Sequence, residues 1–283
     1  MTMNQQTTSA LANARQNVEA DACDQRVMPA FRTRLFEPQH SVVGAVLLLP
    51  GYTSPTDQFA DLAQILADRG YYAYIPRAPR HGVVDGPLRI APTAPELQAY
   101  ARSGADIVMR LCPGSSGAIG LSGGAVLAAW LTAQSDIQLN RLLLLNPFLE
   151  PARRLVPKWR LHLLLAIYGT QRWLPDRPDP THEARTFAGL ASYLLLARSI
   201  PRQLLPIHID AALITAPGDD QVDLAVAAQR FQQWFPSGRH YQLPRAWNLT
   251  HDIAGRSSLE PWADTVYDEY ANVYCCQSTG FQL

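Results

Sequence analysis

The sequence predicts an α/β fold in which a mostly parallel sheet is flanked by helices. Two observations lead to this prediction. Short, nearly continuous apolar runs recur along the chain, as expected for strands that are covered on both faces. Segments with helical spacing separate these runs, and such an alternation is typical of parallel sheets with crossover helices. The 283 residues, of which 47% are hydrophobic and 17% charged, are enough for one large core.

The individual elements follow from this pattern in chain order. Seven apolar runs are interpreted as strands, at residues 31–36, 42–49, 71–75, 117–121, 142–145, 211–215 and 240–243. Five segments are interpreted as helices, at residues 56–68, 95–111, 125–133, 224–235 and 261–274. Residues 1–30 carry only a weak helical stripe, so we expect an N-terminal arm or a frayed helix there.

The alternation is interrupted once, in residues 148–206, where two helical stretches replace a single crossover. We interpret this segment as a small helical cap inserted between the sixth and seventh core strands, with residues 31–147 and 207–283 forming the core. The apolar side chains of its first stretch include Trp159, Leu161, Leu163, Leu164, Leu165, Ile167, Tyr168 and Trp173. They could bind an acyl chain over the cleft or simply pack the cap onto the core.

The overall composition excludes some classes of function. Because 24 Lys and Arg balance 24 Asp and Glu, nothing favours nucleic-acid binding. The four cysteines show no metal-ligand spacing, so we expect neither a metal nor a cofactor. The N-terminus lacks the pattern of a secretory signal, and the most apolar stretch, residues 161–168, is too short to span a bilayer. We therefore expect a cytoplasmic protein without a transmembrane segment.

A candidate nucleophile lies in residues 120–124, Gly-Leu-Ser-Gly-Gly, which match G-x-S-x-G between a predicted strand and a predicted helix. A serine on such a sharp turn is pushed into the cleft, and glycines on both sides allow the chain to pass close to itself. The start of the helix also favours negative charge beside Ser122. The alternative is that Ser122 only caps the helix.

Two further loops, in the same order along the chain, resemble those of α/β-hydrolases, and carboxylesterases and monoacylglycerol-lipase-like enzymes are the nearest subgroup. Residues 47–52, Leu-Leu-Leu-Pro-Gly-Tyr, are similar to the H-G-aromatic oxyanion loop of that family. Residues 74–82 are similar to its P-x-x-P-G-H-G loop. Pro50 stands where the family usually has His, and Arg80 where it often has Gly.

This resemblance implies specific roles for backbone groups and side chains. The oxyanion hole would use the backbone N–H groups of Tyr52 and Gly123. An acid should follow the strand at residues 211–215, where Gly-Asp-Asp-Gln-Val is similar to the family's G-x-D-x-V loop. Aligning on D-x-V selects Asp220, with Asp219 as the alternative, although either residue could merely cap the next helix.

Among the seven histidines, His251 lies in a loop between the last predicted strand and the terminal helix, so we expect it to be the base. His81 comes too early in the chain for that role and is expected to brace its own loop by hydrogen bonding. These expectations describe a serine hydrolase that cleaves a small-molecule or lipid-like carboxylic ester through an acyl-enzyme on Ser122. A thioesterase or acyltransferase could use the same groups, and a non-catalytic binding protein could retain the fold.

Overall fold

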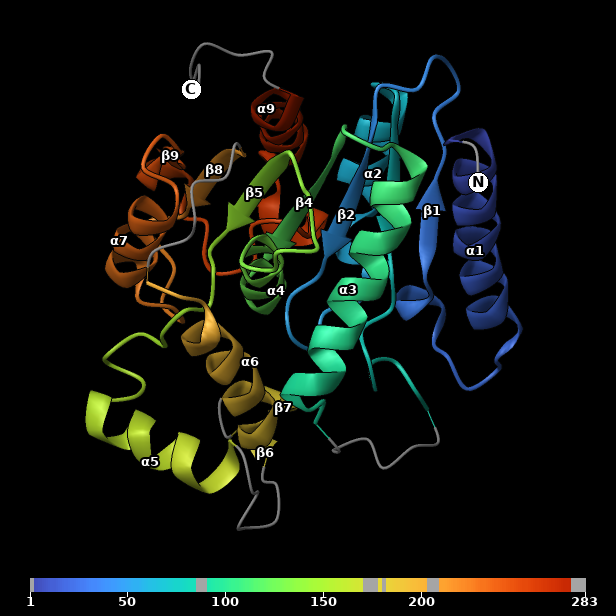
Figure 1. Cartoon of the computed structure of the whole chain (residues 1–283). Coiled ribbons are helices and arrows are strands. Elements are labelled where there is room, and N and C mark those ends of the chain that lie inside the picture. Colours follow the sequence, from blue (N-terminus) through green and yellow to red (C-terminus); the bar gives the residue numbers. More distant parts are fainter. Residues whose placement is uncertain (1–2, 85–90, 170–177, 180–181, 203–208, 276–283) are drawn as a thin grey trace.

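The computed structural model describes residues 3–84, 91–169, 178–179, 182–202 and 209–275, and it contains one large sheet between two layers of helices (Figure 1). The strands of this sheet are β1 (Arg34–Phe36), β2 (Gly44–Leu49), β3 (Tyr71–Ile75), β4 (Ser116–Leu121), β5 (Arg141–Leu145), β8 (Asp210–Thr215) and β9 (Arg239–Gln242). Their order is β1-β3-β2-β4-β5-β8-β9, and only β1 pairs antiparallel to its neighbour. The predicted fold class and all seven predicted strands are confirmed.

Helices bury both faces of this sheet. The core helical segments are η1 (Pro29–Phe31), η2 (Thr56–Phe59), α2 (Ala60–Asp68), α3 (Ala94–Leu111), α4 (Gly123–Thr132), α7 (Leu224–Trp234), η3 (Arg245–Trp247), α8 (Arg256–Leu259) and α9 (Ala263–Cys275). Residues of α3, α4 and α7 share one hydrophobic cluster with one face of the sheet, and residues of α2 and α9 share a second cluster with the other face. Every residue of β2 and β4 is buried, which explains their continuous apolar sequence.

This sheet also determines where a site can form. The parallel strands β2, β4, β5 and β8 end at the same edge of the sheet, and ligands of open α/β sheets bind in the crevice outside these carboxyl ends. The loops after β2, β4 and β8 carry Tyr52, Ser122 and Asp219, respectively. Within the described ranges, no helix is long and apolar enough to cross a membrane.

The N-terminal segment is more ordered than the sequence suggests. It forms α1 (Met3–Cys23), a continuous helix that packs on α3 and lies beside β1 at the edge of the sheet (Figure 1). Ala10 and Ala14 are 2% and 0% exposed in this packing. The expectation of an arm or a frayed helix was therefore wrong, because the helix packs through small alanines that give only a weak apolar stripe.

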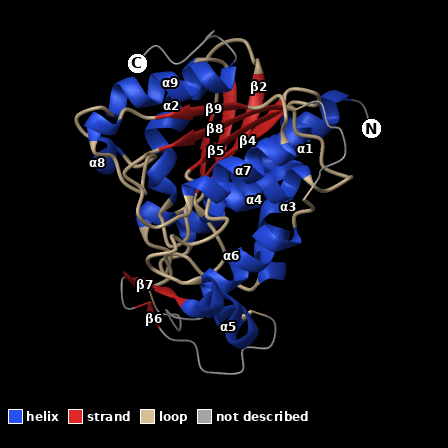
Figure 2. Cartoon of the chain, turned by 90° about the vertical axis from the view of Figure 1, so that its left-hand side faces the viewer, coloured by secondary structure: helices blue, strands red, loops and turns tan. Residues whose placement is uncertain are grey.

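The described residues between β5 and β8 form two helices and a hairpin. They are α5 (Lys158–Tyr168), β6 (Pro178–Asp179), β7 (His182–Thr186) and α6 (Phe187–Ser199). Figure 2 shows α5, β6 and β7 at the end of the molecule away from most of the sheet. The insertion follows β5 and precedes β8, the fifth and sixth strands of the sheet, so its predicted position between the sixth and seventh strands was wrong by one. In the described part of the chain, five strands of this sheet precede the segment, as many as the predicted runs before residue 148.

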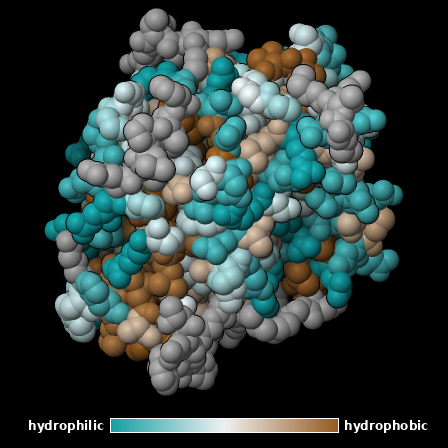
Figure 3. Space-filling model, in the orientation of Figure 1, coloured by the Kyte–Doolittle hydropathy of each residue, from teal (hydrophilic) through white to brown (hydrophobic). Residues whose placement is uncertain are grey.

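Helix α5 exposes part of its apolar surface. Leu161 and Leu165 are buried in a cluster with residues of α6, whereas Trp159 and Leu163 are 64% and 52% exposed. In Figure 3, hydrophobic residues gather on the surface over α5. Of the two alternatives for this stretch, packing therefore applies to Leu161 and Leu165 but not to Trp159 and Leu163, which face solvent. Acyl binding by this stretch stays a prediction. Trp173 lies outside the described residues.

Candidate active site

Ser122 lies on the sharp turn between β4 and α4. Its backbone angles, φ 55° and ψ −116°, are unfavourable for a residue with a side chain. The turn is possible because Gly120 and Gly124 approach so closely that a Cβ on Gly120 would overlap the backbone of Gly124. Ser122 occupies the N-cap position of α4, but its hydroxyl makes no capping hydrogen bond. The Ser122 hydroxyl therefore points toward a partner outside α4.

That partner is His251. The Nε2 atom of His251 lies 2.8 Å from the Ser122 Oγ, and its Nδ1 lies 2.7 Å from the Asp219 Oδ2. Because an ionised carboxylate only accepts hydrogen bonds, Nδ1 carries the proton, and Nε2 of the neutral ring accepts from the serine hydroxyl. Ser122 and His251 are 9% and 6% exposed, and the Asp219 side chain is fully buried. This arrangement can pass the serine proton to the imidazole.

The carboxylate beside His251 is that of Asp219, which corrects the prediction of Asp220. The Asp219 Oδ1 accepts hydrogen bonds from the backbone N–H groups of Gln221 at 2.8 Å and Val222 at 3.2 Å. These bonds, together with the bond that Asp219 Oδ2 accepts from the imidazole, turn Asp219 toward the interior. The following residue then points outward.

Asp220 lies at the surface. Its carboxylate pairs with Arg154 at 2.8 Å, and the two side chains are 58% and 60% exposed. The alternative that these acids cap α7 is also wrong, because the cap is Asp223, whose side chain accepts from the N–H of Val226. Aligning the loop on D-x-V thus selected the wrong neighbour of two adjacent aspartates.

A buried asparagine that the sequence interpretation missed joins the loops of the acid and the base. Asn146 follows β5, is 0% exposed and has a left-handed φ of 38°. Its Nδ2 donates to the carbonyl oxygens of His251 at 3.0 Å and Thr250 at 3.3 Å, and its Oδ1 accepts from the N–H of Ala216 at 3.0 Å. A polar Asn-Pro pair directly after a buried apolar run was the signal that could have identified it.

The loop after β2 reaches the nucleophile from the other side. A Cβ placed on Gly51 would lie 3.7 Å from the Cβ of Ser122, in van der Waals contact. The ring of Tyr193, from α6, lies 5.3 Å from the Tyr52 ring and would be 2.8 Å from a Cβ on Gly123. Tyr52 and Gly123 therefore both border Tyr193 beside the turn that holds Ser122. Whether their N–H groups form an oxyanion hole stays a prediction.

His81 braces its own loop through Pro79, as the sequence predicted, and it also holds the loop after β2. Its Nε2 accepts from the N–H of Thr53 at 2.9 Å, so Nδ1 carries the proton and donates to the carbonyl of Pro79 at 2.9 Å. Burial lowers the pKa of His81, and the Pro79 carbonyl opposes that shift only in part. A neutral ring is required here because a protonated Nε2 could not accept the Thr53 hydrogen bond.

Arg80, at the position where similar loops often have glycine, adopts the backbone conformation that glycine favours. Its φ is 66°, and its guanidinium pairs with Glu96 at 2.6 Å, at the start of α3. Arg80 and the Thr93 cap lower the pKa of Glu96 to about 2. This ion pair secures the side chain that replaces the usual glycine. In the described ranges, no cluster of three or more His, Cys, Asp or Glu could hold a metal ion.

Comparison with known proteins identifies the fold. No protein-family model and no curated protein sequence matches this chain. Among solved structures, a metagenome-derived lipolytic enzyme of the LipS and LipT pair is similar with a TM-score of 0.65 and 18% identity, covering 88% of this chain and 99% of that chain. Monoglyceride lipase from Saccharomyces cerevisiae is similar with a TM-score of 0.68 and 13% identity, covering 88% and 92%.

A monoacylglycerol lipase from Paleococcus ferrophilus is similar with a TM-score of 0.64 and 14% identity, covering 87% of this chain and 98% of that chain. The shared coverage extends over nearly the whole length of each of these lipases. The order and direction of the strands, the turn at Ser122 and these structural likenesses agree: the chain has the α/β-hydrolase fold.

Proposed function

We propose that this protein is a serine hydrolase that cleaves a carboxylic ester through an acyl-enzyme on Ser122. The observation that carries this proposal is the hydrogen-bonded chain from Ser122 through His251 to Asp219, with distances of 2.8 and 2.7 Å. Such a chain activates a serine hydroxyl, which is a weak nucleophile at neutral pH. Lipases and esterases among the structural neighbours support an ester as substrate, although structural similarity by itself shows only a shared fold.

In the acylation step, the Ser122 Oγ attacks the ester carbonyl while its proton passes to Nε2 of His251. The imidazolium so formed is stabilised by the Asp219 carboxylate at Nδ1. Collapse of the tetrahedral intermediate breaks the bond to the alcohol oxygen, and this oxygen takes the proton from Nε2. In deacylation, water gives a proton to Nε2 and attacks the acyl carbonyl. The bond from the acyl carbon to Oγ then breaks, Oγ takes the proton from Nε2, and the acid is released.

The developing oxyanion needs donors that are already in place. We assign this role to the backbone N–H groups of Tyr52 and Gly123. Gly123 begins α4, and the first N–H groups of a helix have no acceptor within the helix. The chain is held on both sides of Tyr52, because the N–H of Gly51 donates to Gln58 and the N–H of Thr53 donates to His81. Both assigned donors border the nucleophile turn, as an oxyanion hole requires.

We assign residues 148–206 as a cap that contacts the substrate through α6 and the segment after β5. Phe148 donates its N–H to the Ser122 carbonyl at 3.1 Å, so this side chain begins beside the nucleophile. Phe148 and Phe187 are partly exposed and pack against the apolar cluster of the cap. They offer an apolar surface for the acyl group at the junction of cap and core. Trp159 and Leu163 do not, because they face solvent.

The experiment that tests this function combines labelling with kinetics. A fluorophosphonate probe should label one site, and peptide mapping should place it at Ser122. Ser122→Ala should abolish labelling and release of p-nitrophenol from p-nitrophenyl butyrate. The matched control is Ser199→Ala at the exposed end of α6, where both signals should persist. Labelling that survives in Ser122→Ala would contradict the proposal.

The same preparation separates the ester hypothesis from its alternatives. A panel of p-nitrophenyl esters and matching acyl thioesters, compared by kcat/KM, should favour the oxygen esters. Preference for thioesters would move the assignment to a thioesterase with the same acyl-enzyme. A protein that binds the probe covalently but turns over neither panel would call for an acceptor other than water. Absence of both labelling and turnover would support a non-catalytic binding protein.

A further inference from the structure

The C-terminal part of α1 places a buried carboxylate against the core. Asp21 is 8% exposed, and its Oδ2 accepts hydrogen bonds from the N–H of Thr33 at 2.9 Å and the Thr33 hydroxyl at 2.6 Å. Its Oδ1 accepts from Nε of Arg77 at 2.9 Å, with Nη2 also at 2.9 Å. Burial raises the pKa of Asp21, but the bonds from Arg77 and Thr33 outweigh it and hold the pKa below its usual value.

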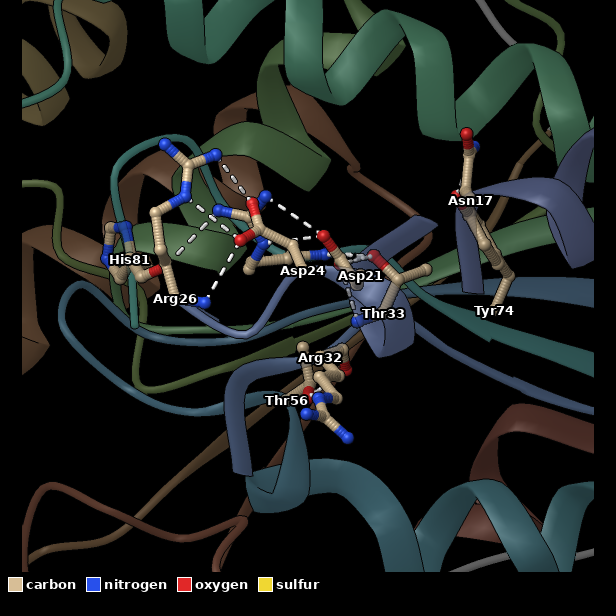
Figure 4. A network of polar contacts seen from close by, with 10 residues as sticks. Asn17, Asp21, Asp24, Arg26, Arg32, Thr33, Thr56, Tyr74 and His81 are labelled. Carbon is tan, nitrogen blue, oxygen red and sulfur yellow. Dashed lines mark hydrogen bonds and ion pairs between the residues drawn. The ribbon is translucent and has the colours of Figure 1, made fainter. Parts of the chain in front are cut away.

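Arg77 continues this network into the loop of His81. Its Nη1 donates to the His81 carbonyl at 3.4 Å, and its own N–H donates to the Thr33 hydroxyl at 3.1 Å. The guanidinium is thus a fork between Asp21 of α1 and the loop that carries His81. Figure 4 shows His81 and Asp21 within one polar network. Only a side chain with several fixed donors can serve both partners at once.

The segment after α1 is fastened to both loops by further bonds. The N–H of Met28 donates to the Gly82 carbonyl at 2.8 Å, next to His81. The Thr56 hydroxyl, which follows the Tyr52 loop, contacts the carbonyls of Ala30 at 3.0 Å and Arg32 at 2.6 Å. The chain between α1 and β1 therefore binds the start of η2 and the His81 loop together.

These contacts converge on a strained residue. Thr53 has a φ of 70°, a left-handed conformation that β-branched residues rarely adopt. Its N–H is bonded to the buried His81, which fixes the peptide that follows Tyr52. Strained backbone persists only where the surroundings impose it. The imposing groups here are His81 and, behind it, Arg77 and Asp21.

We propose that α1 belongs to the active-site scaffold and that Asp21 is a positioning residue, acting through Arg77 and His81 on the loop that presents the Tyr52 N–H. This inference rests on the proposed function, because the loop matters for rate only if Tyr52 stabilises an oxyanion. The active site would then depend on helix α1, which lies outside the sheet and precedes the core in the sequence. Asp21 touches no substrate in this scheme.

The variant that tests the proposal is Asp21→Asn, which keeps the size of the side chain but removes the charge that holds Arg77. We expect kcat for p-nitrophenyl butyrate, per active site titrated with fluorophosphonate, to fall about tenfold, with KM changed less than about twofold. Complete loss of one oxyanion donor costs roughly 10² to 10³-fold, so a displaced donor should cost less. Amide hydrogen exchange at Thr53 should become faster in the same variant.

The matched control is Glu37→Gln. Like Asp21, Glu37 forms an ion pair that involves α1, because it accepts from Arg15 of that helix at 2.7 and 2.9 Å. Glu37 follows β1, however, and its pair lies outside the loops of Tyr52 and His81. This variant should leave kcat and the exchange of Thr53 at wild-type values. Arg77→Lys provides a milder second variant, because lysine can still pair with Asp21 but lacks the fork that also reaches His81. It should lower kcat and speed Thr53 exchange, even if Asp21→Asn fails to fold.

The outcomes separate positioning from plain stabilisation. If Asp21→Asn and Arg77→Lys lower the melting temperature but leave kcat and Thr53 exchange at the values of Glu37→Gln, the proposal is overturned. If wild-type Ser122 is not labelled at all, the proposed function fails, whereas the exchange of Thr53 still decides whether Asp21 holds the loop. Faster exchange with an unchanged kcat would show that the loop is held by α1 but does not supply an oxyanion donor, and would overturn the catalytic part of the proposal.

Discussion

Replacing Asp219 with asparagine should remove most of the catalytic rate, and the structure shows why. In the native protein, Oδ1 accepts two backbone N–H bonds, from Gln221 and Val222, while Oδ2 faces Nδ1 of His251. In Asp219→Asn, the amide oxygen must stay on the side of the two N–H donors. The amide NH₂ is then forced toward Nδ1.

This orientation inverts the tautomer of the histidine. Nδ1 would have to accept from the amide, so the ring proton would sit on Nε2 and point at Ser122 instead of accepting its proton. The wrong tautomer in a serine triad costs about 10⁴-fold in kcat, which corresponds to about 5 kcal/mol of transition-state stabilisation. Folding should change little, because the bonds to Gln221 and Val222 are retained.

Asp220→Asn is the matched control. Asp220 pairs with Arg154 where both side chains are more than half exposed, and such surface pairs contribute about 0–1 kcal/mol to stability. Its kcat should stay within about twofold of the wild type. The assay is steady-state hydrolysis of p-nitrophenyl butyrate, with circular dichroism as the check on folding. A mild Asp219→Asn and an inactive Asp220→Asn would refute the reasoning and return the acid to Asp220.

Three further predictions concern neighbouring parts of the molecule. Asn146→Ala should lower the free energy of unfolding by about 2–4 kcal/mol in urea unfolding, because buried hydrogen bonds are lost. The same variant should lower kcat in steady-state kinetics, and an unchanged kcat would exclude a positioning role. Trp159→Ala should leave the preferred acyl length unchanged in a p-nitrophenyl ester series, since this ring is 64% exposed. Leu161→Ala should instead cost roughly 2–5 kcal/mol of stability, which thermal melting measures. The free energy of unfolding should decrease as pH falls below the ordinary histidine pKa of 6.5, because burial lowers the pKa of His81 and the unfolded chain therefore binds the proton first. His81→Gln should flatten this pH dependence in urea titrations at several pH values. The remaining slope should come from His240, whose pKa burial also lowers.

The sheet was predictable from the sequence because its central strands β2 and β4 are completely buried. Every residue of β2 (44–49) is buried, so the apolar run and the strand coincide. The motif at residues 120–124 was equally informative, because the turn requires both glycines: a Cβ on Gly120 would overlap the backbone of Gly124, and a Cβ on Gly124 would overlap the backbone of Leu49 and Pro50. Local sequence is sufficient where local sterics or burial decides the structure.

The acid and the N-terminal helix were not predictable in the same way. Asp219 and Asp220 are chemically identical neighbours, and only the turn that bonds Asp219 to the N–H groups of Gln221 and Val222 directs one of them inward. Helix α1 packs through Ala10 and Ala14 on a surface that α3 supplies, so its own apolar stripe is weak. In the first case the deciding groups are backbone N–H groups, which a pattern of side chains does not distinguish. In the second case the deciding partner, α3, lies elsewhere in the chain.

The loop at Tyr52 is held from two directions by elements outside the central sheet. On one side, the cap contacts it: the Tyr52 hydroxyl lies 3.3 Å from the Thr186 hydroxyl, and its ring packs on Tyr193. On the other side, the peptide after Tyr52 is bonded to His81, whose loop is tied through Arg77 to α1. Helix α6 and helix α1 therefore both act on the loop at Tyr52 and Thr53, α6 through the Tyr52 side chain and α1 through the Thr53 N–H, although neither contributes a side chain to the chain of Ser122, His251 and Asp219. If the N–H of Tyr52 stabilises the oxyanion, substitutions in either element should alter kcat without touching the triad, and a change in one should be partly masked by a change in the other.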